Sequence, residues 1–313
     1  MAGPLAAGQG TGLEGAFPRS GITGEPSRVQ ILTAVEPLRA ALSALKSGDN
    51  SVALVPTMGA LHEGHLTLVR EAKARADIVV VSIFVNPRQF GPNEDLATYP
   101  RQLEADAALL EVEGVDLLWA PTVEAVYPPG YATTIQVSGL DAVLCGAARP
   151  GHFDGVATVV TKLFNQVQPD IALFGEKDWQ QLAIIRRMAR DLDLTHPHAT
   201  RILGVPTVRE ADGLAMSSRN KYLTPEERAA APAMNRAMRE AAAKIAVGEP
   251  VAATLAALQS AILAAGFARI DYAELRDAAT LEALDPWDGR PARLLVAAHM
   301  GKARLIDNIT VTV

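Results

Sequence analysis

The sequence has a single cysteine, Cys145, and long apolar runs are missing. One cysteine forms neither an intrachain disulfide nor a cysteine-rich metal centre, which is typical of a reducing cytoplasm. Apolar stretches such as residues 78–81 are far too short to cross a bilayer. We therefore expect a cytoplasmic protein without a membrane partner, in which Cys145 is a small packing residue.

Basic residues are in the minority, with 29 Lys and Arg against 35 Asp and Glu and a formal net charge of -6. No run of Lys or Arg stands out, so the sequence carries no electrostatic footprint for nucleic acid. The first 27 residues contain seven Gly and three Pro and lack a basic segment followed by an apolar core. We expect residues 1–27 to be a disordered extension and not a signal peptide.

Residues 28–206 alternate between strand and helix patterns. Strands are expected at residues 52–55, 78–85, 115–119 and 171–174, and helices at residues 31–45, 66–76 and 103–113. Short β-branched runs that alternate with helices indicate βαβ units and a parallel sheet covered on both faces. The pattern predicts an α/β fold with a doubly wound, Rossmann-like nucleotide-binding domain.

The texture changes after residues 201–208, and we place a domain boundary near residues 206–208. Alanine-rich helices are expected at residues 225–245 and 251–264, and strands at residues 270–275, 293–300 and 304–313. The strands are joined closely enough for an antiparallel sheet. Residues 207–313 are therefore predicted to form a smaller α+β lid domain.

The central motif is residues 56–65, Pro-Thr-Met-Gly-Ala-Leu-His-Glu-Gly-His, between an expected strand and an expected helix. A helix N-terminus offers free N–H groups and a positive dipole end, and both suit phosphate. Gly59 and Gly64 allow close approach of the backbone to a ligand. His62 and His65 share a face, and a bound anion should raise the pKa of both imidazoles so that they donate while charged. Neither histidine requires a metal.

Chance is a poor explanation of this motif, because six His and 24 Gly in 313 residues give only about 0.01 random matches to His-x-Gly-His. A zinc site is also disfavoured, since the metalloprotease pattern needs histidines four apart and these are three apart. The motif therefore favours nucleotide binding at the carboxyl ends of the strands.

A second constellation lies at residues 209–220, where two hydroxyls precede a guanidinium in a glycine-containing loop. Ser217, Ser218 and Arg219 have the chemistry of a mobile lid that closes on a triphosphate. Lys177 follows directly after an expected strand, so we expect it to bind phosphate rather than to be a solvated surface lysine. Together with the histidines, these groups would stabilise charge on all three phosphates.

Six motifs together resemble the pantoate–β-alanine ligases of the HIGH-type nucleotidyltransferase superfamily. They are residues 56–65, Phe84-Val85-Asn86-Pro87 with Gln89-Phe90, Tyr99-Pro100-Arg101, Arg149-Pro150-Gly151-His152-Phe153, residues 174–178 and residues 216–220. The likeness runs from about residue 29 to the C-terminus. It implies that pantoate attacks the α-phosphorus of MgATP to give pantoyl adenylate and pyrophosphate, and that the amine of β-alanine then displaces AMP.

The resemblance also implies site residues. The catalytic positions are His62, His65 and Lys177, with His65 as proton donor and Lys177 as phosphate clamp. The ATP site would comprise Met58, Gly59, His62, Gly64, His65, Gly175, Glu176, Lys177, Asp178, Val208, Met216, Ser217, Ser218 and Arg219. Pantoate would contact Met58, Asn86, Gln89 and Gln181, and β-alanine would contact Gln89; Arg149 and His152 would order this pocket. Asp106 matches the position of the Mg²⁺ ligand, although polar neighbours of some relatives are replaced here by Ala105 and Leu109. A homodimer is implied by the resemblance alone.

Three other readings remain open. A nucleotidyltransferase of the same superfamily with a phosphorylated small-molecule acceptor would want basic residues in place of Gln89 and Gln181. A nucleotide-binding regulatory module would bind ATP without releasing pyrophosphate. An aminoacyl-tRNA synthetase shares related signatures, but the short acidic chain and the absence of a tRNA-binding appendage disfavour it.

Overall fold

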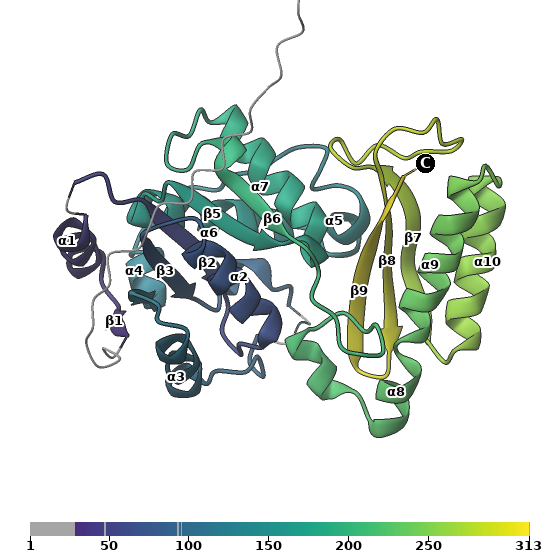
Figure 1. Ribbon diagram of the computed structural model, residues 1–313, viewed down its shortest axis with the longest axis horizontal. Coiled ribbons are helices and arrows are strands. Elements are labelled where there is room, and N and C mark those ends of the chain that lie inside the picture. Colours follow the sequence, from purple (N-terminus) through teal and green to yellow (C-terminus); the bar gives the residue numbers. More distant parts are fainter. Residues whose placement is uncertain (1–28, 47, 93, 95, 313) are drawn as a thin grey trace, which may run out of the picture.

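The computed structural model describes residues 29–46, 48–92, 94 and 96–312, so the extension predicted for residues 1–27 lies outside the described residues. These residues build two sheets that lie side by side (Figure 1). The larger sheet is parallel, in the order β1 (Gln30–Leu32), β4 (Leu117–Trp119), β3 (Ile78–Ile83), β2 (Val52–Thr57), β5 (Ile171–Gly175) and β6 (Ile202–Val205). The order reverses between β2 and β5, which are adjacent in the sheet although three crossovers separate them along the chain.

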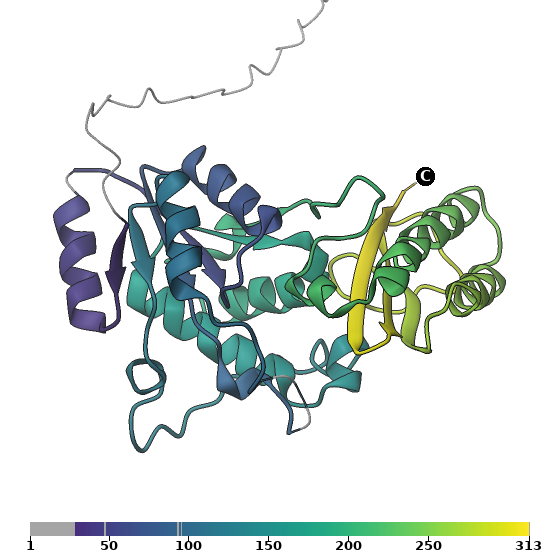
Figure 2. The same ribbon diagram turned by 90° about the horizontal axis from the view of Figure 1, so that it is seen from below.

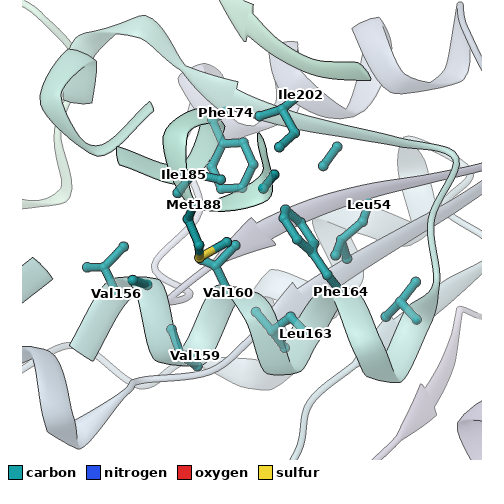
Figure 3. Packing of buried hydrophobic residues seen from close by; sticks show 14 of the residues in the cluster. Leu54, Val156, Val159, Val160, Leu163, Phe164, Phe174, Ile185, Met188 and Ile202 are labelled. Atoms are coloured by element: carbon teal, nitrogen blue, oxygen red, sulfur yellow. The ribbon is translucent and has the colours of Figure 1, made fainter. Parts of the chain in front are cut away.

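Helices cover both faces of this sheet. Helices α1 (Val35–Leu45), α6 (His152–Val167) and α7 (Trp179–Asp191) pack on one face, and α2 (Glu63–Lys73) and α3 (Leu103–Val112) pack on the other. The strands alternate accordingly: Leu54 and Val80 face α6, whereas Val55 and Val79 face α2. Figure 3 shows α6 and α7 packed on the sheet around Phe164 and Phe174. The doubly wound arrangement predicted from the sequence is confirmed.

Several short elements connect these layers. They are α4 (Val123–Val126), α5 (Leu144–Ala148) and the 3₁₀ turns η1 (Pro87–Gln89), η2 (Glu176–Asp178), η3 (Ala199–Arg201) and η4 (Ser218–Tyr222). Two of them, η1 and η2, follow the carboxyl ends of β3 and β5, so they bring their side chains to the edge of the sheet where ligands bind in such folds.

The second sheet is antiparallel, in the order β7 (Arg269–Asp277), β8 (Ala292–Met300) and β9 (Ala303–Val311). Helices α9 (Ala233–Ala246) and α10 (Val251–Ala264) cover its outer face, and α8 (Pro225–Ala230) precedes them. Its other face looks toward the parallel sheet (Figures 1 and 2). The predicted antiparallel sheet is confirmed; the boundary between residues 206 and 207 stays a proposal, supported by a separate apolar core whose first member is Leu214.

Proline explains the two largest errors in the predicted helix bounds; α2 also begins and ends three residues before the expected residues 66–76. Residues 30–32 form β1, which pairs with β4, and α1 begins only at Val35. Pro37 fits the first turn of that helix, whereas a helix from residue 31 would have placed it in the interior. The helix expected at residues 225–245 is broken between α8 and α9, where Pro232 lies. Helices α6 and α7 and strand β6 were not predicted at all.

No helix in the described ranges combines the length and apolar character needed to cross a membrane.

Candidate active site

Two adjoining cavities lie where the strand order reverses and the two sheets meet. The inner cavity, of about 250 Å³, lies beyond the carboxyl ends of β2, β3, β5 and β6. The outer cavity, of about 740 Å³, extends from there to the antiparallel sheet. Residues that line both are Arg149, His152, Lys177, Asp178, Gln181, Ser217 and Arg219. The cavities therefore form one cleft, with the parallel sheet on one side and the residues after β6 on the other.

Asp106, which is fully buried, stabilises the turn after β2 by hydrogen bonds to its backbone. Its two carboxylate oxygens accept the backbone N–H groups of Ala60 (2.8 Å) and Leu61 (2.9 Å). Gly59 has φ +83°, and a Cβ there would come within 3.1 Å of Asp106 Oδ2 and of Ile83. Gly59 is thus required by the turn and does not itself line either cavity.

His62 and His65 close the N-terminus of α2 as a reciprocal cap. The Nδ1 atom of His62 accepts from Gly64 N (3.2 Å), and Nδ1 of His65 accepts from His62 N (3.3 Å). Because a backbone N–H can only donate, each neutral imidazole carries its proton on Nε2. The two rings lie 4.1 Å apart, and both residues line the inner cavity. Each therefore offers one Nε2–H donor to a ligand.

The protein environment keeps both imidazoles neutral at pH 7. Burial, together with the nearby His62 and Lys177, lowers the pKa of His65 to about 3. Burial lowers the pKa of His62 to about 4, with Lys177 and Lys221 acting in the same direction and Asp178 opposing them. The charging of both histidines by a bound anion, which the sequence led us to expect, stays a prediction; the protein's own groups act against it, because buried imidazolium beside ammonium groups is costly.

Gln89, on η1, is buried and lines the inner cavity. Its Oε1 accepts from Asn86 Nδ2 (3.1 Å), and its Nε2 lies 2.9 Å from the sulfur of Met58. Asn86 is saturated: it also donates to Gly155 O and accepts from the hydroxyl of Tyr127. Asn86 lines neither cavity, and its amide orients Gln89; the direct contact with pantoate that the resemblance implied stays a prediction.

The side chains of Arg149 and His152 both contact the backbone carbonyl oxygen of Gln89. Nδ1 of His152 donates to Gln89 O (2.7 Å), and Nη2 of Arg149 donates to that oxygen at 3.3 Å. Nη1 of Arg149 donates to Nε2 of His152, and Arg149 forms a two-bond ion pair with Glu94. Burial, together with the nearby Arg149, lowers the pKa of His152 to about 4, although Gln89 O, Glu94 and Asp178 act in the opposite direction. The ordering role expected of Arg149 and His152 stays a prediction, which these contacts support.

The turn η2 carries Lys177 and Asp178, which line both cavities, and α7 continues it with Gln181. Gly175 lines the inner cavity, while Glu176 lines neither. Oε2 of Glu176 instead accepts from Arg293 of β8 at 2.8 Å. Glu176 was expected in the ATP site, but its carboxylate is engaged in joining the two sheets.

The opposite wall comes from the loop after β6. Val208, Met216, Ser217, Ser218 and Arg219 line the inner cavity. A bridge between Arg209 and Ala215 forms the base of this loop, and Arg209 is anchored to Asp307 of β9 by two bonds of 2.7 and 2.9 Å. The hydroxyls and guanidinium expected as a lid therefore face the histidine motif across one cavity.

Asp106 does not fit the metal site that the resemblance implied. Besides the two backbone donors, its Oδ1 accepts from Gln102 Nε2 (3.0 Å), and it lines neither cavity. Within the described ranges no group of three or more His, Cys, Asp or Glu side chains is placed to hold a metal ion. The position matches, but the carboxylate is already used by the turn.

The sequence analysis did not find the apolar wall of the inner cavity or the polar end of the outer one. The apolar wall comprises Phe84, Phe90, Tyr99, Val156, Val159, Val160, Leu163 and Phe174. At the polar end, the sulfur of Cys145 lies 3.0 Å from the hydroxyl of Tyr272, and Arg304 donates to Asp271. Helical spacing in residues 152–167 was the available signal for part of the wall; the polar end depends on contacts between distant segments.

Comparison with known proteins places this geometry in context. The family model for pantoate-beta-alanine ligase matches residues 30–310. A pantothenate synthetase from Novosphingobium aromaticivorans is 69% identical over 283 residues, which cover 90% of this chain and 99% of that protein. One from Sphingopyxis alaskensis is 62% identical over 283 residues, covering 90% of this chain and 100% of that protein.

Solved structures give the same picture. A crystal structure of pantothenate synthetase from Thermus thermophilus has a TM-score of 0.83 at 50% identity, covering 91% of this chain and 100% of that chain. A pantoate-beta-alanine ligase from Francisella tularensis, crystallised in complex with beta-gamma ATP and beta-alanine, has a TM-score of 0.75 at 34% identity. That match covers 90% of this chain and 97% of the other.

Proposed function

Because this chain belongs to the pantoate-beta-alanine ligase family, we propose that the cleft between its two sheets is where ATP activates pantoate for attack by β-alanine. The chain is an AMP-forming ligase that condenses (R)-pantoate with β-alanine to pantothenate, through a pantoyl adenylate. The observation that carries the assignment of the site is the opposition of His62 and His65 to Ser217 and Arg219 across one cavity. The family comparisons support this reaction and not a phosphorylated acceptor.

In the first step, the carboxylate of pantoate attacks the α-phosphorus of ATP, and pyrophosphate leaves. The nucleophile is already an anion, so the protein's contribution is to hold the reactants in line and to stabilise negative charge on the phosphates. Neutral Nε2–H groups of His62 and His65 would donate from the end of α2, where the helix dipole also favours anions. The ammonium of Lys177 and the guanidinium of Arg219 would act from the two sides of the cleft.

In the second step, the amine of β-alanine attacks the carbonyl carbon of the adenylate, and AMP leaves with the C–O bond electrons. Pantoate combines a carboxylate and hydroxyls with a gem-dimethyl group, so its pocket needs amide groups beside an apolar wall. Gln89 and Gln181 supply the amides, and Met58 with Phe84 and Val159 supplies apolar surface. Gln89 would then orient β-alanine as well.

Magnesium is proposed to enter with ATP and to be held mainly by phosphate oxygens and water, as Mg²⁺ commonly is in such enzymes. When bound, it would neutralise phosphate charge. The saturated carboxylate of Asp106 argues against direct ligation by this residue. We therefore assign Asp106 to the turn that presents His62.

A homodimer and a cytoplasmic location also stay predictions. The dimer rests on the resemblance, and equilibrium sedimentation of the purified chain tests it: a monomer at micromolar concentration would contradict it. The single cysteine supports a reducing compartment, and fractionation of the source cells tests the location.

Exchange of labelled pyrophosphate into ATP tests the proposed chemistry directly. With pantoate present and β-alanine absent, a reversible adenylation step predicts exchange, and adding β-alanine should then yield AMP and pantothenate. If pantoate gives no exchange, repeating the assay with β-alanine separates an obligatory binding order from a wrong acceptor. Exchange that requires a phosphorylated acceptor instead of pantoate would refute the assignment.

Replacing Lys177 tests the phosphate clamp. We expect Lys177→Ala to lose about 2 to 4 kcal/mol of transition-state stabilisation, by analogy with removal of one preorganised charge donor, while the free energy of unfolding is unchanged. Lys244→Ala, which removes an exposed lysine of α9, is the matched control. Unchanged kcat/KM in Lys177→Ala would remove this residue from the mechanism.

A further inference from the structure

A buried asparagine of the antiparallel sheet is bonded to the turn that carries Lys177. Asn308, on β9, is 3% exposed. Its side-chain Nδ2 donates to two successive carbonyl oxygens of η2, Glu176 O at 2.8 Å and Lys177 O at 3.0 Å. Both N–H groups of the Asn308 amide therefore donate to the backbone of the turn that carries Lys177, whose side chain lines the cleft.

Asn308 is itself fixed by its neighbours. Its Oδ1 accepts from Arg293 Nη1 (3.0 Å), and its backbone N–H donates to Asp307 Oδ1 (2.8 Å). Arg293 also donates to Glu176 Oε2 at 2.8 Å, and its guanidinium lies 3.6 Å from the centroid of the Trp179 ring. Strands β8 and β9 thus contact η2 and the start of α7 in three ways: Asn308 bonds the backbone of η2, and Arg293 contacts the carboxylate of Glu176 and the ring of Trp179.

This junction has a bearing on catalysis because Asn308 provides side-chain hydrogen bonds to the backbone of η2 that the N-cap of the turn does not. No side chain caps the N-terminus of the turn. The ammonium of Lys177 acts on both histidines, since it lowers the pKa of His62 and of His65 after burial. A shift of the turn would move that charge relative to the phosphate-binding groups, and displacements of about 1 Å can cost about 100-fold in rate.

We propose that Asn308 is a positioning residue for the adenylation step, which aims Lys177 at the phosphates by tying η2 to the antiparallel sheet. This inference rests on the function proposed above for Lys177. Asn308 lines the outer cavity, but η2 engages both of its side-chain N–H groups, so in this scheme it touches no reacting atom and acts through Lys177 alone. The docking of the two sheets is then part of the active site and not merely a connection between two folded units.

A double-mutant cycle in the full chain tests the inference, with pyrophosphate–ATP exchange in the presence of pantoate as the readout. Asn308→Ala should reduce the exchange rate about tenfold or more. If Asn308 acts through Lys177, adding Asn308→Ala to Lys177→Ala should change the rate by less than about twofold. Independent effects that multiply in the double variant would overturn the proposal.

Asn308→Asp guards against a simple folding defect. Aspartate keeps the volume and still accepts from Arg293, but it loses both donors and sets an oxygen against the two carbonyls of η2. We expect exchange to fall as in Asn308→Ala, while thermal unfolding shows a folded protein. Thr254→Ala, which removes a buried hydroxyl bonded within α10, controls for lost hydrogen bonding elsewhere in the second unit. Normal exchange in Asn308→Asp would refute the proposal.

The outcomes also separate this inference from the role assigned to Lys177. Normal exchange in Lys177→Ala alone would refute both. A defect in Lys177→Ala combined with wild-type exchange in both Asn308 variants would overturn only the positioning role.

Discussion

Gly155 offers a test of how tightly the pocket proposed for pantoate is built, because it lies where α6 crosses η1. A Cβ at this position would lie 2.6 Å from the carbonyl carbon of Arg88 and 2.7 Å from the backbone nitrogen of Gln89, and closer still to the carbonyl oxygen of Arg88. These are backbone atoms, which cannot rotate away as a flexible side chain would. Gln89, whose side chain lines the inner cavity, therefore takes part in this contact through its backbone nitrogen.

The expected magnitude follows from this geometry. Ordinary contact begins at 3.4 Å, so Gly155→Ala must separate the helix from η1 by about 1 Å. Overpacking of this kind costs about 1 to 3 kcal/mol, against which alanine gains about 1 kcal/mol in helix propensity. We expect a net loss of about 1 kcal/mol in the free energy of unfolding. A displacement of Gln89 by 1 Å should lower kcat/KM for pantoate by about 100-fold.

Steady-state kinetics with varied pantoate and urea unfolding measure the two effects. Gly91→Ala is the matched control, since its Cβ would meet only the side chain of Glu94, at 3.7 Å, although it lies close to the same pocket. A Gly155→Ala protein that is more stable than wild type, with normal kcat/KM, would refute the claim that this contact sets the position of Gln89.

Three further predictions concern groups whose environment the structure defines. Asp106→Asn sets an amide N–H against a backbone N–H, so unfolding free energy should fall by about 1 to 3 kcal/mol in urea titrations. Arg209→Ala leaves Asp307, whose side chain is 1% exposed, without its ion pair and should cost about 3 to 5 kcal/mol in the same assay. Acidification from pH 7 to pH 5 should lower the free energy of unfolding, because His65 and His152 stay neutral in the folded protein while both bind protons in the unfolded chain below pH about 6.5. The expected loss is on the order of 2 kcal/mol for each histidine. Replacing either histidine with Gln should flatten the dependence of stability on pH in urea titrations.

The parallel sheet was predictable because its strands are short apolar runs bounded by turn residues, and such runs mark buried parallel strands. The histidine motif could be proposed as a site for a different reason, because it stands at a strand-to-helix turn, where the backbone itself favours anions. The lowering of both pKa values by the protein's own groups was not predictable, because burial and the approach of Lys177 depend on residues far away in the sequence.

Helix α6 shows why other parts escaped prediction. It is rich in Val and Thr, which have modest helix propensity, and most of its residues are buried, so few polar positions reveal the helical period. Tertiary burial overrides local preference here. The apolar wall that this helix gives the inner cavity, through Val156, Val159 and Val160, was missed with it.

The role of Asp106 could not be predicted from its residue type, because a carboxylate can bind a cation or accept hydrogen bonds from two backbone N–H groups. In this fold it holds Ala60 and Leu61, the two residues directly before the histidine that caps α2. If that is its task, Asp106→Asn should raise KM for ATP and lower unfolding free energy together, with the Mg²⁺ dependence of the rate unchanged. A lost metal ligand would instead raise the Mg²⁺ concentration for half-maximal rate while unfolding stays as in wild type. Two measurements on one variant therefore decide between a turn that presents the histidines and a direct contact with the metal.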